Sequence, residues 1–278
     1  MPETDAGWYA GVDQDDVESL SARIKTGTAD APKHWPRLAI EQGFCSDEQT
    51  YIDVLNQAAR TAALEAVSTR EEADDQQVIH AVRAIEDLDC TSNELAERVR
   101  EWGRTTDLPV ASSRDEVINL ADAVPSTPIE AEIVAIATTI EALHTRRASL
   151  VSTVERTMHA IAPNLAAMAG PILGARLIAL AGGLEDLAKM PSSTLQVLGA
   201  EDALFAHLRG EAPSPKHGII FTHEYVRGTR PAERGSAARA VAGKFAIAAR
   251  VDHYAGDHRP ALEDELQTRI ERIRGRSA

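Results

Sequence analysis

The stretch that decides the fold is 162-APNLAAMAGPILGARLIALAGGLEDLAKMPSSTLQVLGAEDALF-205, in which short apolar runs are interrupted by proline and glycine. Within it, 164–190 is typical of a helix, a tight glycine turn and a second helix. Pro163 is expected to end any helix that precedes it. A further helix start is predicted at Pro191, and a stop at Gly210. The stretch therefore predicts a set of short, packed helices.

Two longer apolar runs lie upstream, and both follow the alternating four-and-three spacing of a helix that buries one face. Six of the seven positions at this spacing are apolar in 78–103, and eight of the ten are in 129–161. A connection rich in proline and serine separates the runs, so we predict a long antiparallel coiled-coil hairpin within 71–162. The hairpin either packs only within its own chain or forms a homodimer as a four-helix bundle, which we favour because one seam leaves apolar surface uncovered. Arg147, a charge on the seam, either fixes the register or reaches solvent.

The first seventy residues carry five of the eleven aromatic side chains, namely Trp8, Tyr9, Trp35, Phe44 and Tyr51. Short apolar patches alternate here with turn signals, which indicates a small α+β or irregular helical domain over 1–70. This domain either packs on its neighbour or forms a docking surface for a protein partner.

The composition favours a mainly α fold, because aromatic residues are 4% of the chain and Ala, Leu, Ile and Val supply most apolar positions. Cys45 and Cys90 have neither the spacing of a zinc site nor the number for a disulfide framework, so we predict that both are reduced and buried. The first residues lack a signal-peptide pattern, and no stretch is apolar for the ~18 residues that a membrane span needs. We therefore expect a cytoplasmic protein with no membrane partner.

The formal net charge of −14 is unevenly distributed along the chain. Residues 1–150 carry −16 and residues 151–278 carry +2, while the segment 209–250 reaches +5. Only five of the 29 basic residues are lysine. An acidic chain with few lysines is typical of a halophilic protein, whose acidic surface maintains solubility in a high-salt cytoplasm. The basic segment on this acidic chain indicates an anionic partner such as nucleic acid.

The basic segment includes a predicted helix over 236–252. On a helical wheel Arg239 and Arg250, eleven residues apart, share one face, and apolar side chains cover the opposite face. Lys244 falls on the apolar arc, where it either extends its ammonium to solvent or reaches a phosphate. The segment 254–278 is predicted to be a charged amphipathic helix without a specific role.

The sequence contains no recognisable catalytic constellation. The glycines of 170–183 imitate a nucleotide-binding loop, but the preceding strand and the downstream acidic residue of such a site are missing. P-loop, HExxH and GxSxG motifs are absent and the histidines are scattered, so we expect no catalytic residue, no metal and no cofactor. Phosphates are bound by cations, loop N–H groups and helix N-termini, and 209–250 offers all three. RNA bases also require planar partners, and the candidates are His223, Tyr225, Arg227 and Arg230.

At these residues the chain resembles the archaeal Nop-domain scaffold proteins of box C/D ribonucleoproteins, which are related to eukaryotic nucleolar and spliceosomal Nop-domain proteins. The matching text is the stretch 162–205, then PKHGIIF (215–221), then RGSAARAVAGKFAIAARVD (234–252), with order and spacing preserved. In addition, AVRAIEDLDCTSNELAERVREW (81–102) is similar to the family's first coiled-coil helix. The resemblance covers about two-thirds of the chain.

The resemblance implies a small N-terminal domain, a coiled-coil helix pair and an all-helical Nop domain over 163–253. It implies that the Nop domain binds the kink-turn of a box C/D guide RNA together with a kink-turn-binding ribosomal-type protein. The N-terminal domain would recruit the methyltransferase fibrillarin for guide-directed 2′-O-methylation of rRNA or tRNA, and this chain would be a scaffold and not an enzyme.

Several residues are assigned roles on this basis. The RNA-binding candidates that the resemblance implies are Lys216, His223, Arg234, Arg239 and Lys244, to which the basic segment adds Arg227, Arg230 and Arg250. The signature motif comprises Gly199, Ala200, Glu201, Ala203, Leu204 and Phe205. Asp202 and Ala206 stand where the family has cations, so the RNA contact is expected to shift toward Lys216–Arg250. The segment 1–70 is shorter than the family's fibrillarin-binding domain, so docking is either reduced, rebuilt around Trp8, Trp35 and Phe44, or lost.

Two other functions are compatible with parts of the sequence. Gly170–Gly174, followed by a helix and by Gly182–Leu184, is similar to the phosphate-binding turn of helix-hairpin-helix DNA-binding proteins. That turn needs neighbouring cations, and only Arg176 and Lys189 lie beside it in sequence. The other alternative is a coiled-coil adaptor that does not bind RNA.

Overall fold

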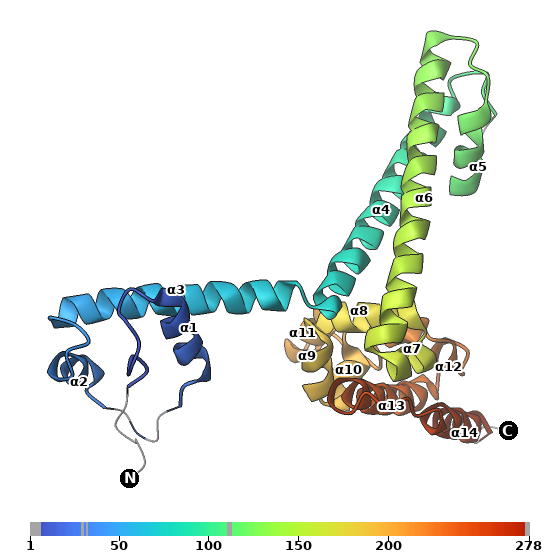
Figure 1. Cartoon of the computed structure of the whole chain (residues 1–278). Coiled ribbons are helices and arrows are strands. Elements are labelled where there is room, and N and C mark those ends of the chain that lie inside the picture. Colours follow the sequence, from blue (N-terminus) through green and yellow to red (C-terminus); the bar gives the residue numbers. More distant parts are fainter. Residues whose placement is uncertain (1–6, 29–30, 32, 110–112, 276–278) are drawn as a thin grey trace. The chain divides into compact units, whose positions relative to one another are not determined.

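A computed structural model describes residues 7–28, 31, 33–109 and 113–275 of the chain (Figure 1). The described residues form fourteen α-helices and two short 3₁₀ helices, with no strand among them. The predicted mainly α fold is therefore confirmed. The chain divides into two compact units, Met1–Ala73 and Asp74–Ala278. The predicted segment 1–70 falls in the first unit, and the other three segments fall in the second except for residues 71–73.

The first unit contains α1 (Val17–Thr26), α2 (Trp35–Glu41) and α3 (Glu48–Glu71). Two of its helices are capped by carboxylates, because Asp16 and Asp47 accept the backbone N–H groups of Ser19 and Thr50. The hydrophobic core of this unit consists of Tyr9, Leu20, Ala39, Cys45, Tyr51 and Ala58, with Trp8, Trp35 and Phe44 partly buried against it. The described part of this unit is thus helical, with an aromatic core.

In the second unit, α4 (Asp74–Gly103) and α6 (Pro128–Ile161) form the predicted antiparallel helix pair (Figure 1). The connection carries α5 (Arg114–Asn119) and the 3₁₀ helix η1 (Leu120–Asp122), which pack back onto the pair. The shared core of this region consists of Ala96, Val99, Leu108, Val117, Leu120, Ile133, Ala137 and Ile140. Short as it is, the connection therefore adds apolar contacts to the far end of the hairpin.

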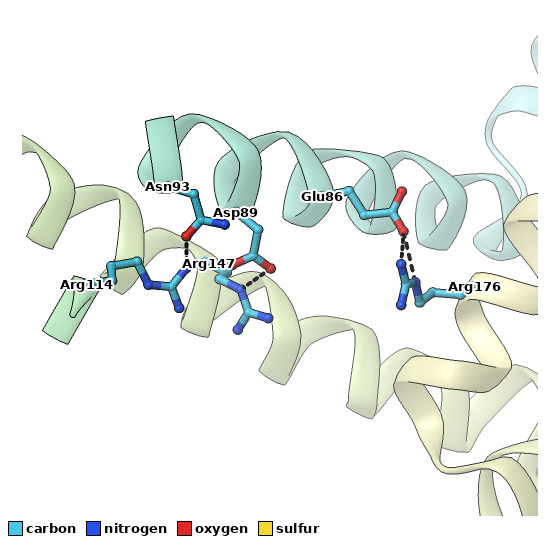
Figure 2. Close-up of polar contacts among 6 residues, drawn as sticks. All are labelled: Glu86, Asp89, Asn93, Arg114, Arg147 and Arg176. Atoms are coloured by element: carbon cyan, nitrogen blue, oxygen red, sulfur yellow. Dashed lines mark hydrogen bonds and ion pairs between the residues drawn. The ribbon is translucent and has the colours of Figure 1, made fainter. Parts of the chain in front are cut away.

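The seam of the hairpin contains a polar clamp (Figure 2). Arg147 of α6 donates from Nε to Oδ2 of Asp89 on α4 at 2.7 Å, and Arg114 of α5 donates to Oδ1 at 3.1 Å. Burial opposes the ionisation of Asp89, but hydrogen bonds and attraction from Arg147 and Arg114 hold its pKa below the usual value. Arg147 is therefore paired across the hairpin while about one-third of its side chain stays exposed, and a role in fixing the register stays a prediction.

The rest of the second unit consists of short helices packed around one long helix. They are α7 (Pro163–Ala169), α8 (Pro171–Ala181), α9 (Leu184–Lys189), α10 (Ser192–Val197), α11 (Glu201–Leu208), η2 (Ile219–Thr222), α12 (Glu224–Arg227), α13 (Arg234–Tyr254) and α14 (Ala261–Gly275). The break at Gly182, where φ is 95°, lies where the sequence predicts it, whereas Gly170, with φ of 77°, adds a break that divides the first predicted helix into α7 and α8. The long helix is α13, which contains the predicted 236–252 and buries Val241 and Phe245 completely.

Three expectations about burial were wrong. Cys45 is buried as predicted, but Cys90 is exposed, because it lies outside the four-and-three spacing on the outer side of α4. Trp102 at the end of α4 and Ile129 at the start of α6, both predicted on the seam, are also exposed. At this first turn of α6 the buried side chain is Glu130, whose Oε2 accepts the backbone N–H of Ser126 at 2.6 Å as part of the helix cap.

Among the described helices, none is by itself long and apolar enough to cross a membrane. Only α7 and α8 taken together have the length and composition, and they are bent by 116° at the break between them.

Candidate nucleic-acid interface

The loop that carries Lys216 is held against α10 by backbone contacts. Gly218 donates its N–H to the carbonyl of Gln196 at 2.9 Å, and Ile219 donates to the carbonyl of Leu198 at 2.8 Å. A Cβ on Gly218 would lie 2.0 Å from the Leu198 oxygen, so only glycine allows this approach. The Lys216 side chain is exposed and runs beside Gly235 in the first turn of α13. The loop thus places Lys216, one of the predicted cations, beside the first turn of α13.

A stack of three planar groups lies next to this loop. The ring of His217 is stacked on Phe221, with centroids 4.6 Å apart, and the guanidinium of Arg234 lies 5.3 Å from the Phe221 centroid. Burial, with a contribution from the positive charge of Arg234, lowers the pKa of His217. The neutral ring is a suitable surface for base stacking. The sequence analysis did not select His217 or Phe221, although both lie in the quoted segment 215–221.

His223 has contacts within the protein at both ring nitrogens. Its Nδ1 accepts the backbone N–H of Tyr225 at 3.2 Å, which makes it the N-cap of α12, and Nε2 therefore carries the proton and donates to the Met168 carbonyl at 3.0 Å. Burial lowers the pKa of His223, which favours this neutral form. The ring also packs edge-on against Phe245 and Tyr225. An RNA contact of His223 stays a prediction, and the structure adds a role in packing.

Several of the predicted cations have polar contacts within the chain. Arg250 donates to the carbonyls of Ala188 and Met190 at the end of α9, where a cation complements the helix dipole. Arg234 donates to the Thr229 carbonyl at 3.1 Å and fastens the loop before α13. The ammonium of Lys244 reaches Glu265 on α14 and forms an ion pair.

The other predicted cations lie at the surface. Lys216, Arg227, Arg230 and Arg239 are exposed. Arg239 and Arg250 do share a face of α13, but the Arg250 guanidinium folds back toward α9. Arg239 therefore remains as the cation that α13 presents from this face.

The signature turn forms as the glycine predicts. Gly199 has φ of 80°, and its N–H donates to Oε1 of Glu201 at 2.8 Å. The helix that follows, α11, buries none of its residues and exposes Phe205 and Leu208. Its first turn holds Glu201 and Asp202, so this helix begins with negative charge where phosphates would require cations.

The two cations that lie beside the helix-hairpin-helix turn in sequence are both paired with carboxylates. Arg176 of α8 pairs with Glu86 of α4, with Nη2 and Oε1 2.8 Å apart (Figure 2). Lys189 pairs with Glu185 one turn earlier on α9. The described residues also bring no three His, Cys, Asp or Glu side chains together as a metal site.

Comparisons with known proteins identify relatives by sequence and by fold. An uncharacterised NOP5 family protein of Methanocaldococcus jannaschii is 42% identical over 238 residues, which are 72% of this chain and 57% of that protein. The probable nucleolar protein 5-2 of Arabidopsis thaliana is 32% identical over 243 residues, which are 73% of this chain and 46% of that protein. The chain thus spans about half the length of these curated relatives.

A similar fold is found in the crystal structure of a fibrillarin/Nop5p complex. One chain of it matches with a TM-score of 0.54 and 25% sequence identity, over 92% of this chain and 92% of that chain. The family described as Nop, snoRNA binding domain, fibrillarin, matches residues 33–273. The chain therefore belongs to the Nop family.

Proposed function

We propose that this chain is a cytoplasmic, non-catalytic scaffold of a box C/D ribonucleoprotein. It binds the kink-turn of a guide RNA together with a kink-turn-binding ribosomal-type protein, and it positions fibrillarin for guide-directed 2′-O-methylation of rRNA or tRNA. The observation that carries the proposal is a set of exposed cations, Lys216, Arg227, Arg230 and Arg239, on one unit of a Nop-family chain whose net charge is −14. Surface cations at this density on an acidic protein are expected for binding of a phosphate backbone.

The RNA part of the proposal is tested by an electrophoretic mobility shift. A kink-turn RNA that is already bound by its kink-turn-binding protein should shift further when the chain is added. Arg239→Glu should abolish this second shift, because it reverses a charge on a side chain that has no hydrogen bond or ion pair with any described residue. Arg104→Glu, at an exposed arginine near the far end of the hairpin, is the matched control and should leave it unchanged. Absence of a second shift with the unaltered chain would favour the adaptor without RNA binding.

The fibrillarin part of the proposal concerns the first unit. Its aromatic residues are not a free surface, since Trp8 donates from Nε1 to the Tyr51 hydroxyl at 2.9 Å and Phe44 is stacked on Tyr9. The exposed apolar side chains of α3 are better candidates for docking, because Leu64 and Val67 are 62% and 53% exposed one turn apart.

Co-purification with fibrillarin tests this docking surface. The double variant Leu64→Asp/Val67→Asp should lose fibrillarin, whereas Val124→Asp in the second unit, at a side chain 88% exposed, should retain it. Equal recovery of fibrillarin by both variants would exclude docking at this face of α3.

Self-association through the helix pair is a further part of the proposal. Ile129 and Trp102 are exposed on α6 and α4, so apolar surface remains near the end of the pair. Light scattering of the full chain should give twice the mass of one chain, and Ile129→Asp should shift the equilibrium to the monomer. A monomeric mass for the unaltered chain at all concentrations would contradict the homodimer.

A further inference from the structure

An open groove of about 540 Å³ runs between α13 and α14. Four cations line it, two from each helix: Arg239 and Lys244 on α13, and Arg269 and Arg272 on α14. The acidic residue among the lining side chains is Glu265, which pairs with Lys244. The groove therefore has an excess of positive charge on both walls, although the whole chain is acidic.

The arginines of α14 have different roles. The apolar face of this helix, Leu266, Ile270 and Ile273, is buried in the main core and fixes the helix in place. Arg274 is bound within the protein, because it donates to the Thr229 hydroxyl and to the Glu224 carbonyl. Arg269 and Arg272, by contrast, have no hydrogen bond or ion pair with any described residue. Together with Arg239 they are like charges held in one groove, an arrangement that an anion would stabilise.

A glycine in the floor of the groove supports the presence of a ligand. Gly243 lies in the middle of α13, where glycine is less favourable for helix formation than alanine. Gly174 in α8 is explained by packing, since a Cβ there would lie 3.0 Å from the Met158 methyl. A Cβ on Gly243 would meet no atom within 4 Å. Packing within the protein therefore does not require a glycine at position 243, and the missing side chain leaves space in the groove.

We propose that the α13–α14 groove is a binding cleft for the phosphodiester backbone of RNA, in which Arg269 and Arg272 act together with Arg239 and Lys244. This inference deepens the proposed function and rests on it. Four cations against one carboxylate exceed the charge of about −2 of a single phosphate group, so successive phosphodiesters fit the groove better than an isolated anion. Glu265 weakens binding, because it holds Lys244 and repels phosphate.

The test measures affinity for a kink-turn RNA pre-bound by its kink-turn-binding protein, at several salt concentrations. Arg269→Gln/Arg272→Gln should weaken binding about tenfold or more. It should also reduce the slope of log affinity against log salt concentration by about two. Arg104→Gln/Arg146→Gln, two exposed arginines of the hairpin, removes the same charge and should have little effect. Thermal unfolding should be unchanged in both variants, since neither touches the buried face of α14.

Two single variants separate phosphate binding from a structural role. Glu265→Gln should bind RNA several-fold more tightly, because it removes the acidic side chain and releases Lys244. Gly243→Glu should weaken binding, because it places a carboxylate in the floor. Inorganic phosphate added at matched ionic strength should not displace the RNA, and displacement by it would overturn the assignment to a backbone.

The outcomes distinguish this inference from the proposed function. If Arg269→Gln/Arg272→Gln binds RNA with unaltered affinity and salt slope while Arg239→Glu abolishes binding, the groove assignment is overturned and the scaffold proposal stands. If the unaltered chain does not bind the kink-turn complex, both are overturned.

Discussion

Asp252, buried near the end of α13, accepts hydrogen bonds from both the backbone N–H and the side-chain amide of Asn164, at 3.0 and 2.6 Å. Its other oxygen accepts the N–H of Leu165 at 2.9 Å. The carboxylate thus binds the free N–H groups at the start of α7 from a helix 88 residues later in the chain. Asn164 in turn accepts the N–H of Arg259 at 2.6 Å, so the same contact positions the segment before α14.

Asp252→Ala should strongly destabilise the second unit. The substitution leaves three buried donors without their acceptor, and we expect a loss of roughly 3 kcal/mol or more in the free energy of unfolding. Asp257→Ala is the matched control, because it removes an exposed carboxylate and keeps the backbone carbonyl that Asn164 uses. Urea unfolding of both variants gives the comparison, and equal stability of the two would contradict the assigned role of Asp252.

The clamp at Asp89 should show measurable coupling to Arg147. Both side chains are about one-third exposed, at 32% and 35%, so solvent screening limits the interaction to about 0.5–1 kcal/mol. A double-mutant cycle with Asp89→Ala and Arg147→Ala measures this coupling energy. Arg98→Ala, which removes an exposed arginine paired on its own helix, should lower stability less than Arg147→Ala. A coupling energy of zero would mean that the clamp does not stabilise the register.

Acidification should lower the stability of the second unit at pH values above those at which its carboxylates titrate. Burial lowers the pKa of His223 below the value of about 6.5 of the unfolded chain, so the unfolded state binds more protons as the pH falls past that value. The stability present at pH 7.5 is then progressively lost toward pH 5. His217 has a lowered pKa as well and acts in the same direction. The lowered pKa of Asp89 has its effect only below about pH 4, outside this window.

The free energy of unfolding, measured between pH 7.5 and 5, tests this expectation. His223→Gln should reduce the dependence on pH, because an uncharged side chain replaces the titrating ring. An unaltered pH slope in this variant would show that His223 is not responsible.

The two glycines Gly218 and Gly243 should respond in opposite ways to alanine. Gly218→Ala brings a Cβ against the Leu198 carbonyl oxygen, and because that atom is backbone, we expect a loss of at least about 2 kcal/mol. Gly243→Ala meets open space within a helix and should stabilise the protein by up to about 1 kcal/mol. Thermal melting of the two variants provides the measurement, and destabilisation by Gly243→Ala would contradict the open floor of the groove.

Much of the helical architecture follows from local sequence rules. The four-and-three spacing predicts α4 and α6 because those helices bury a continuous apolar face, and Pro163 and Gly182 end helices as expected. The long helix α3 was not predicted as such. Only Tyr51, Ala58 and Ala62 are buried along it, so it has too few large apolar residues to produce a recognisable periodicity.

The roles of the individual cations could not be predicted from the sequence. A helical wheel gives the direction of a side chain at Cβ, but a long guanidinium can end far from there, as Arg250 does when it reaches the carbonyls of α9. The groove depends on α13 and α14 lying side by side, and the sequence does not specify this contact. Arg269 and Arg272 therefore belong to a helix for which the sequence predicted no specific role.

The central claim is that the basic surface recognises a kink-turn RNA in complex with its protein. The most direct measurement compares, at several salt concentrations, the affinity of the chain for that complex with its affinity for plain duplex DNA of the same length. We predict a preference for the kink-turn complex of at least about tenfold that persists as salt weakens both interactions. Equal affinity for the two ligands at every salt concentration would contradict the claim.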